Sequence, residues 1–177
     1  VISAVRESRD PDFRKAFRRS LPAYAWVTHA AVILAALVVA PLVIGENVQI
    51  RLPTEWEWQW AAQGGFAQRE YPWEGPFESQ RVNSLESGLG ETTAVGTYPG
   101  GAALCGALDM SGNVWELCLN EYDRLKVDMK STEAHVLRGG SFHDGAHIIR
   151  CAARPDHNPG NWLSGVGFRV ICAAALP

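Results

Sequence analysis

Two histidines and two aspartates near the end of the chain are the residues whose types could bind a metal ion. His143 and His147 are four residues apart, and Asp144 and Asp156 lie near them in the sequence. Imidazole and carboxylate groups are common zinc ligands, and on a helix a spacing of four places two side chains on one face. The surrounding residues follow neither a helical nor a strand period, so this spacing does not bring the side chains together. We therefore predict no metal site here.

The four cysteines are the next candidates for chemistry. Cys105, Cys118, Cys151 and Cys172 include no close pair with the spacing of zinc ligands. Because disulfide frameworks are typical of much shorter secreted chains, we expect mainly buried thiols, with one or two disulfides if the protein is exported. The chain also lacks a nucleophile elbow, a phosphate-binding loop and a His-Glu zinc motif, so the sequence predicts no catalytic residue.

Length and charge limit the class of protein. The chain has 177 residues, of which 47% are hydrophobic and 20% charged, and this is enough for one domain with a sizeable core. Its formal net charge is -3, whereas a surface that binds duplex nucleic acid normally has a basic excess. We predict one domain and no nucleic-acid partner.

A segment without charged residues, 21–45, raises the alternative of a membrane span. A basic cluster at 14–19 precedes it, as it would precede a span with a cytoplasmic N-terminal flank. The unbroken apolar run 30–44 is shorter than the roughly 20 residues that a span needs, and Pro41 would break its last turns. We favour a buried helix over 30–40 and a soluble protein, with surface display or membrane anchoring as the alternatives.

Local signals predict one short helix that must position part of the chain. Thr54 and Glu57 form a capping box, which predicts a helix over 55–62. Trp56 and Trp60 lie on one side of this helix. Tryptophans at that spacing are more typical of packing than of a cofactor site, so we expect them to pack.

Strands and turns are predicted in the remaining chain. Residues 74–101 have turn chemistry throughout and predict a long loop. A turn at 111–113 leads into an alternating strand that continues to Leu119, and two further strands are predicted over 135–137 and 166–172.

In the last forty residues, short motifs typical of a structural scaffold alternate with positions that follow no pattern. The segments 150–154, 158–162 and 167–170 contain residue types typical of cores, turns and hydrogen-bonded arginines. The residues between them follow no period. This contrast indicates a rigid scaffold that displays replaceable side chains.

Several sequence motifs along the chain together resemble those of the formylglycine-generating-enzyme (sulfatase-modifying factor) superfamily. They are Arg51-Leu52-Pro53-Thr54-Glu55, Gly64-Gly65, Tyr71-Pro72-Trp73, Asp109-Met110-Ser111-Gly112-Asn113-Val114-Trp115-Glu116, Arg138-Gly139-Gly140-Ser141 and Gly167-Phe168-Arg169. The resemblance implies an α+β, C-type-lectin-like fold with a small antiparallel sheet, two helices and much irregular loop. It divides the chain into a poorly assigned N-terminal segment, 1–26, and a lectin-like domain, 27–177.

The resemblance also implies a chemistry, the oxidation of a sulfatase cysteine to formylglycine. Enzymes of this kind bind copper through two cysteines that follow the Arg-Gly-Gly-Ser word, because thiolates hold Cu(I). The segment 142–149 contains no cysteine. Cys151 belongs to the scaffold motif 150–154, and Cys172 lies beyond the last predicted strand. We therefore predict a protein that is not an enzyme and has no cofactor. Copper is disfavoured, and a structural calcium ion is an alternative that no ligand run specifies.

The same fold, ending a few residues after Gly-Phe-Arg-Val, resembles the variable proteins of diversity-generating retroelements. There a reverse transcriptase copies a template with errors at adenines, so asparagine codons become any codon with a pyrimidine third base. Such codons cannot encode Lys, Glu, Gln, Met or Trp. None of these residue types occupies an irregular position between Phe142 and Val166. The resemblance therefore implies a variable region over about 136–172.

The irregular positions are the predicted ligand-binding residues: His143, Asp144, Gly145, His147, Ile148, Pro155, Asp156, His157, Leu163, Ser164 and Gly165. Additional candidates are Phe142, Asn158 and Asn161. The predicted scaffold residues are Trp115, Glu116, Arg138, Arg154, Trp162 and Arg169, with Glu116 buried and bonded to backbone and the arginines bracing loops. The predicted function is binding of an unknown ligand, a protein or cell-surface molecule. The alternative is a non-catalytic or divergent formylglycine-generating-enzyme-like protein.

Overall fold

The computed structural model describes residues 48–123, 126–128, 131–157 and 165–174. Contacts divide the chain into two compact units, one of residues 1–50 and 172–177 and the other of residues 51–171. Two short strands, β1 (Val48–Arg51) and β6 (Ile171–Ala174), pair in a two-stranded sheet.

The described residues include no helix that is both long and apolar enough to cross a membrane. They also include one α-helix, α4 (Glu55–Ala62), where we predicted two. The second predicted helix, 30–40, and the charge-free segment 21–45 that contains it both lie outside the described residues.

Helix α4 begins with the predicted capping box. The Thr54 hydroxyl oxygen accepts a hydrogen bond from the Glu57 amide at 3.3 Å, and the Thr54 amide donates to Glu57 Oε2 at 2.8 Å. Two backbone donors at the start of the helix therefore have partners within four residues of chain, which is why local sequence is enough to set this boundary.

Arg51 adds a charged partner to the same box. Its Nη1 and Nη2 atoms donate to the two carboxylate oxygens of Glu57, each at 2.8 Å, and this hydrogen bonding is the main cause that lowers the pKa of Glu57 to about 2. Because the folded pKa lies below the ordinary 4.5, the stabilisation is complete above pH 4.5 and is lost as the pH falls toward 2.

We therefore expect Glu57→Gln to lower the free energy of unfolding at pH 6, and we expect its difference from the unaltered chain to shrink as the pH falls from 4.5 toward 2. Urea unfolding of both chains at about pH 6, 4 and 3 measures this. A difference that stayed constant over this range would contradict the assigned pKa shift.

The core side of α4 carries Trp58. This indole is 1% exposed and packs in a cluster that includes Met110, Cys118 and Val136. Trp56 and Trp60 are 53% and 51% exposed and lie outside the buried core, although the Trp60 ring makes an edge contact with Phe66, with 4.9 Å between ring centres. The buried positions of α4 are Glu55, Trp58 and Ala62, which follow the helical spacing of three and four, and this stripe excludes the two neighbouring tryptophans.

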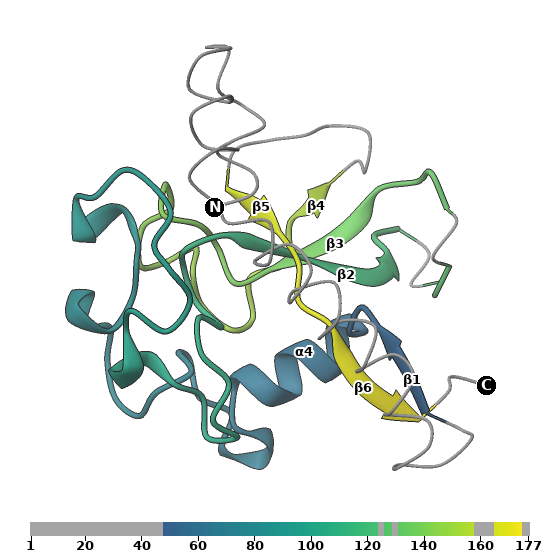
Figure 1. The fold of residues 1–177 in the computed structure, drawn as a ribbon, viewed down its shortest axis with the longest axis horizontal. Coiled ribbons are helices and arrows are strands. Elements are labelled where there is room, and N and C mark those ends of the chain that lie inside the picture. The colour runs from purple at the N-terminus through teal and green to yellow at the C-terminus, as the bar shows by residue number, and fades with distance from the viewer. Residues whose placement is uncertain (1–47, 124–125, 129–130, 158–164, 175–177) are drawn as a thin grey trace, which may run out of the picture. The chain divides into compact units, whose positions relative to one another are not determined.

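A four-stranded sheet holds the second half of the chain, in the order β4 (Asp156–His157), β3 (His135–Arg138), β2 (Trp115–Glu121) and β5 (Val166–Gly167) (Figure 1). Strand β3 is antiparallel to both β2 and β4. Strand β5 is parallel to β2, so the sheet is mixed, whereas we predicted a small antiparallel sheet. Strand β4 lies at one edge of this sheet, and the next strand in the chain, β5, lies at the opposite edge, parallel to β2.

The single strand predicted over 166–172 is divided in two. Residues 166–167 form β5 and residues 171–174 form β6, which belongs to a different sheet. Between the two strands, the Arg169 side chain donates to Glu116 and to the backbone carbonyls of Leu108 and Asp109.

Irregular loop fills most of the chain between α4 and β2, as predicted. It contains four single-turn 3-10 helices: η1 (Gly65–Ala67), η2 (Ser79–Arg81), η3 (Leu85–Ser87) and η4 (Pro99–Gly101). Two buried asparagines stabilise this region: Asn113 Oδ1 accepts from the Thr93 backbone amide at 2.9 Å, and Asn83 Nδ2 donates to the Glu91 backbone carbonyl at 2.8 Å. Side-chain amides here satisfy backbone groups that regular structure would otherwise pair.

Candidate ligand-binding loop and its support

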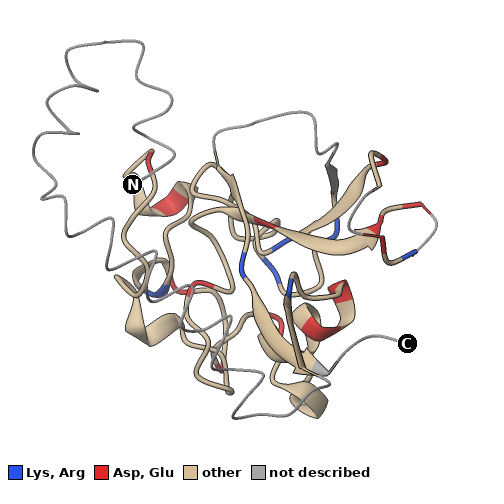
Figure 2. Cartoon of the chain, turned by 45° about the vertical axis from the view of Figure 1, so that its right-hand side comes forward, with Lys and Arg blue, Asp and Glu red and all other residues tan. Residues whose placement is uncertain are grey.

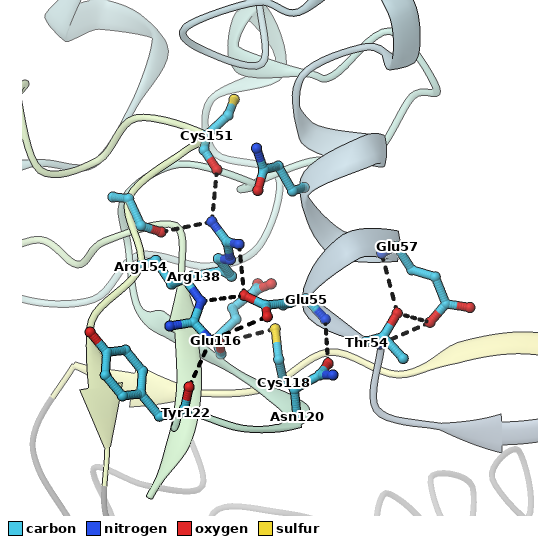
Figure 3. Close-up of polar contacts among 12 residues, drawn as sticks. Thr54, Glu55, Glu57, Glu116, Cys118, Asn120, Tyr122, Arg138, Cys151 and Arg154 are labelled. Atoms are coloured by element: carbon cyan, nitrogen blue, oxygen red, sulfur yellow. Dashed lines mark hydrogen bonds and ion pairs between the residues drawn. The ribbon is translucent and has the colours of Figure 1, made fainter. Parts of the chain in front are cut away.

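Glu55, the first residue of α4, is a buried carboxylate that binds two arginines (Figure 3). Its Oε2 accepts a hydrogen bond from Arg138 Nη2 at 3.0 Å and from Arg154 Nε at 2.6 Å. Arg138 Nη1 also donates to the carbonyl oxygens of Cys151, at 3.5 Å, and Ala153, at 3.1 Å. This cluster ties the helix and β3 to the segment 151–154.

Arg154 makes its remaining contacts with Tyr122. Its guanidinium carbon lies 4.5 Å from the centre of the tyrosine ring, and Nη2 donates to the Tyr122 carbonyl at 3.0 Å. The hydrogen bond with Glu55 raises the pKa of Arg154, whereas burial lowers the pKa of Arg138. Both predicted scaffold arginines thus contact other parts of the scaffold.

Glu116 forms a second buried centre. It accepts hydrogen bonds from Trp58 Nε1 at 2.6 Å and from Arg169, through Nε at 2.5 Å and Nη2 at 2.7 Å. Glu116 is buried as predicted, but its carboxylate accepts from these side chains, so our prediction that it bonds to backbone was wrong. Arg169 supplies the backbone contacts instead, because its Nη2 also donates to the carbonyls of Leu108 and Asp109.

The predicted ligand-binding positions begin in the loop that follows β3, residues 141–150, which we call the display loop. Gly140 precedes it with a φ of 77°, and a Cβ there would lie 2.5 Å from Ile149 Cγ2. Position 140 therefore needs glycine, because its backbone is left-handed and Ile149 leaves no room for a Cβ.

Asp144 fixes the first turn of the display loop. Its Oδ2 accepts hydrogen bonds from the Ser141 amide at 2.9 Å and the Ser141 hydroxyl at 2.6 Å. Its carbonyl accepts from the Leu85 amide at 3.0 Å, which joins the display loop to the long loop before β2. A predicted variable residue thus also has a structural contact.

Glu86 and Tyr71 fix the middle of the display loop. Glu86 Oε1 accepts from the Ala146 amide at 2.8 Å, and the Tyr71 hydroxyl donates to the Ala146 carbonyl at 3.1 Å. Partial burial alone would raise the pKa of Glu86, but the hydrogen bonds from Ala146 and Ser84 outweigh it, so the pKa is lowered. Both backbone groups of Ala146 are therefore bonded to side chains more than fifty residues away.

The predicted ligand-binding residues differ in exposure. His143 and His147 are exposed, whereas Phe142 and Gly165 are buried. The half-buried positions are Asp144, Gly145, Ile148 and Pro155. Asp156 and His157 form β4. Outside the described residues lie Asn158, Asn161, Trp162, Leu163 and Ser164.

The structure brings only part of this set together. A Cβ at Gly165 would lie 3.2 Å from Ser141 Cβ and 3.6 Å from Phe142 Cε1, so Gly165 is adjacent to the start of the display loop. Residues 156–157 instead pair with Val136 and His135, farther along β3. The described positions thus form two groups along the sheet.

Sequence reasoning missed the side chains that hold the display loop. Tyr71 belongs to the family motif Tyr71-Pro72-Trp73, but nothing in that motif indicates a hydrogen bond with Ala146. Glu86 lies in a loop with no local period, and its contact with Ala146 spans 60 residues of sequence. A local pattern could not have identified either contact.

A loop-rich body with small sheets and a loop fixed after Arg-Gly-Gly-Ser defines a formylglycine-generating-enzyme-like fold. Residues 14–174 match the sulfatase-modifying factor enzyme 1-like domain, and the chain belongs to this family.

Comparisons with individual proteins agree with this family. The chain is 33% identical over 142 residues to the inactive C-alpha-formylglycine-generating enzyme 2 of Bos taurus, covering 72% of this chain and 45% of that protein. It is 35% identical over 154 residues to the formylglycine-generating enzyme of Streptomyces coelicolor, covering 71% and 48%. Treponema denticola variable protein 1 has a similar structure, with a TM-score of 0.56 and 29% identity over 68% of this chain and 46% of that one. The chain spans about half the length of these relatives.

The thiols of this chain do not fit a copper-binding pair in the display loop. All four cysteines lie in the described residues and are free, so no disulfide joins them. Cys118 and Cys151 are buried, and burial raises the pKa of each to about 12, which disfavours the thiolate that binds metal. Cys105 and Cys172 are exposed, contrary to our expectation of mainly buried thiols.

We expect Glu86→Ala to loosen the display loop with little effect on the rest of the chain. Loss of the carboxylate leaves the Ala146 amide without its partner and lowers the free energy of unfolding by about 1 kcal/mol. Hydrogen exchange at Ala146, followed by NMR, should become faster. Glu74→Ala is the control, because Glu74 is 90% exposed and has one ion-pair contact of 3.9 Å. Unchanged exchange at Ala146 would show that Glu86 does not hold the loop.

Proposed function

We propose that this chain is a ligand-binding display protein with a C-type-lectin-like fold, diversified by adenine-specific retroelement mutagenesis over about 136–172. The observation that carries the proposal is the display loop. Side chains from distant segments bind its backbone, while His143 and His147 are exposed. Such a loop can change its exposed side chains with little effect on the core.

Two further observations support this proposal. The irregular positions contain none of the residue types that adenine mutagenesis of asparagine codons cannot produce. A protein named as variable, from Treponema denticola, has a similar structure at 29% identity. We propose a protein or cell-surface molecule as the ligand class, because exposed side chains on a loop suit a broad surface more than an enclosed small molecule.

The proposed variable positions differ in how freely they can vary. Replacement of His143 or His147 removes an exposed side chain. Replacement of Asp144 removes the acceptor for two hydrogen bonds from Ser141, and any side chain at Gly165, with a φ of 86°, is strained. Variation should therefore be greatest at the two histidines and smallest at Gly165.

The second candidate is a non-catalytic or divergent formylglycine-generating-enzyme-like protein without diversification. Its support is the 33% identity to a relative named as inactive, together with the lack of cysteine in 142–149 and the raised pKa of Cys118 and Cys151. Both candidates lack the cysteine pair after Arg-Gly-Gly-Ser, and they differ in whether the display loop varies.

Sequencing the genomic neighbourhood of the gene distinguishes the two. Under the proposed function we expect a nearby copy of the stretch that encodes 136–170, differing only where that copy has adenines, beside a reverse-transcriptase gene. If no such copy exists, diversification is excluded and the second candidate stands.

A further inference from the structure

The turn that binds the display loop also carries two exposed leucines. Leu85, the first residue of η3, is 62% exposed, and Leu89, two residues after η3, is 52% exposed. A Cβ at Gly88 or Gly90 would meet no atom within 4 Å, so the space on both sides of Leu89 is open. Leucine is among the residues most often buried, and exposed apolar side chains that gather in one place are typical of an interaction surface.

Leu85 lies directly against the display loop. Its backbone amide donates to the Asp144 carbonyl at 3.0 Å, and the next residue, Glu86, accepts a hydrogen bond from the Ala146 amide at 2.8 Å. The two exposed histidines of the display loop flank this contact in the sequence, one before Asp144 and one after Ala146. The leucine turn and the exposed part of the display loop therefore form one continuous surface.

The turn that presents the leucines is itself held by hydrogen bonds. The Ser87 hydroxyl donates to the Ser84 carbonyl at 2.7 Å, and the Gly88 amide donates to the Leu85 carbonyl at 3.1 Å. The Ser87 amide also donates to the Ser84 carbonyl, at 3.0 Å. Because the backbone is fixed in this way, the leucines are presented to a ligand without a further loss of backbone entropy at the binding step.

The charged side chains of this surface are engaged within the chain. Residues 84–89 and the display loop contain three charged residues, Glu86, Asp144 and Arg150, and most of the chain there is tan in Figure 2. The two carboxylates accept the hydrogen bonds described above, and Arg150 Nε donates to the His147 carbonyl at 2.7 Å. Two imidazoles and two aliphatic side chains are left to meet a ligand, and the centre of a protein–protein interface is likewise apolar and poor in charge.

We infer that Leu85 and Leu89 are a constant, apolar part of the ligand-binding surface, and that the ligand is a protein with apolar side chains at the contact. A nucleic acid or an acidic polysaccharide would require several free cations. A neutral sugar would require hydrogen-bonding partners, which leucine does not offer. This inference rests on the proposed function and extends its site beyond 136–172. The leucines give every variant the same apolar contact, and the displayed positions select the protein that is bound.

Phage display of the full 177-residue chain tests the inference. The library randomises residues 143, 145, 147 and 148. The targets are hen egg-white lysozyme, streptavidin and dextran, an uncharged polysaccharide, and we expect binders to the two proteins. In each binder the double variant Leu85→Ser, Leu89→Ser should weaken the affinity about tenfold, because less apolar surface is removed from water.

Two further variants separate binding from stability. Leu104→Ser is the matched control, because Leu104 is 63% exposed in another loop, and it should leave the affinity unchanged. The melting temperature of each variant should equal that of the unaltered chain, since the replaced side chains are exposed. Leu85→Gln keeps the length of the side chain but makes it polar, so it should weaken the affinity several-fold even if the double variant melts at a lower temperature.

The possible results distinguish failure of the inference from failure of the proposed function. Protein binders whose affinity is unaffected by both leucine variants would overturn the inference and leave the proposed function standing. Binders to dextran alone would overturn the protein ligand. If no target yielded a binder, the display loop would not be a ligand-binding surface, and the proposed function would fail together with the inference.

The genomic test addresses diversification separately.

Discussion

Replacement of Glu55 by alanine will lower the free energy of unfolding by about 3–5 kcal/mol, a large part of the 5–15 kcal/mol typical of a whole domain. The variant leaves the Arg138 guanidinium, 3% exposed, without its carboxylate, and it also removes the bidentate partner of Arg154. Urea unfolding followed by tryptophan fluorescence measures this loss, because Trp58 is buried in the adjacent core.

Two variants control for this result. Glu55→Gln keeps a hydrogen-bond acceptor but loses the charge, so we expect an intermediate loss of stability. Glu74→Ala changes a carboxylate that is 90% exposed and should stay within about 0.5 kcal/mol of the unaltered chain. If Glu55→Ala cost less than about 1 kcal/mol, the Glu55 cluster would not be the anchor that its contacts indicate.

Replacement of Arg169 by alanine will destabilise the chain by about 3 kcal/mol, whereas replacement of His143 will change stability by less than about 0.5 kcal/mol. Arg169 neutralises Glu116, which is 6% exposed, and bonds two backbone carbonyls. His143 is exposed on the display loop. Urea unfolding of both variants tests the division between a scaffold and a displayed surface.

The same pair of variants allows a clear contradiction. Equal losses of stability in Arg169→Ala and His143→Ala would mean that the display loop is part of the scaffold. His147→Ala serves as a second exposed variant in the same loop and should behave like His143→Ala.

Local sequence predicted the elements whose contacts are local. Helix α4 begins and ends at the predicted residues, because its capping box needs only Thr54 and Glu57. Strand β3, predicted over 135–137, extends one residue further to Arg138. The turn at 111–113 also precedes β2 as predicted.

Features that depend on distant partners could not be predicted in the same way. Arg169 binds Glu116 across 53 residues of sequence, and it lies between β5 and β6 in a segment that the local pattern indicates as one strand. Likewise the aromatic spacing of Trp56 and Trp60 is that of a packed face, but the position of Trp58 against Val136 decides which side of α4 is buried.

The ligand-binding role of the candidate residues stays a prediction, and the contacts that hold the display loop could not be predicted from the sequence. Irregular composition indicated His143 and His147, which the structure places on the surface of the display loop. The contacts of Tyr71 and Glu86 with Ala146 span 75 and 60 residues, so no local period could indicate them.

The hydrogen bonds to Ala146 have a consequence for the entropy of binding. A loop whose backbone both donates to Glu86 and accepts from Tyr71 has lost much of its conformational freedom before any ligand arrives. Ordering an interface opposes association, so a loop ordered during folding leaves a smaller unfavourable entropy at the binding step. Under the proposed function, each new combination of side chains would keep this advantage without selection for rigidity, and affinity would depend mainly on the groups that the loop presents.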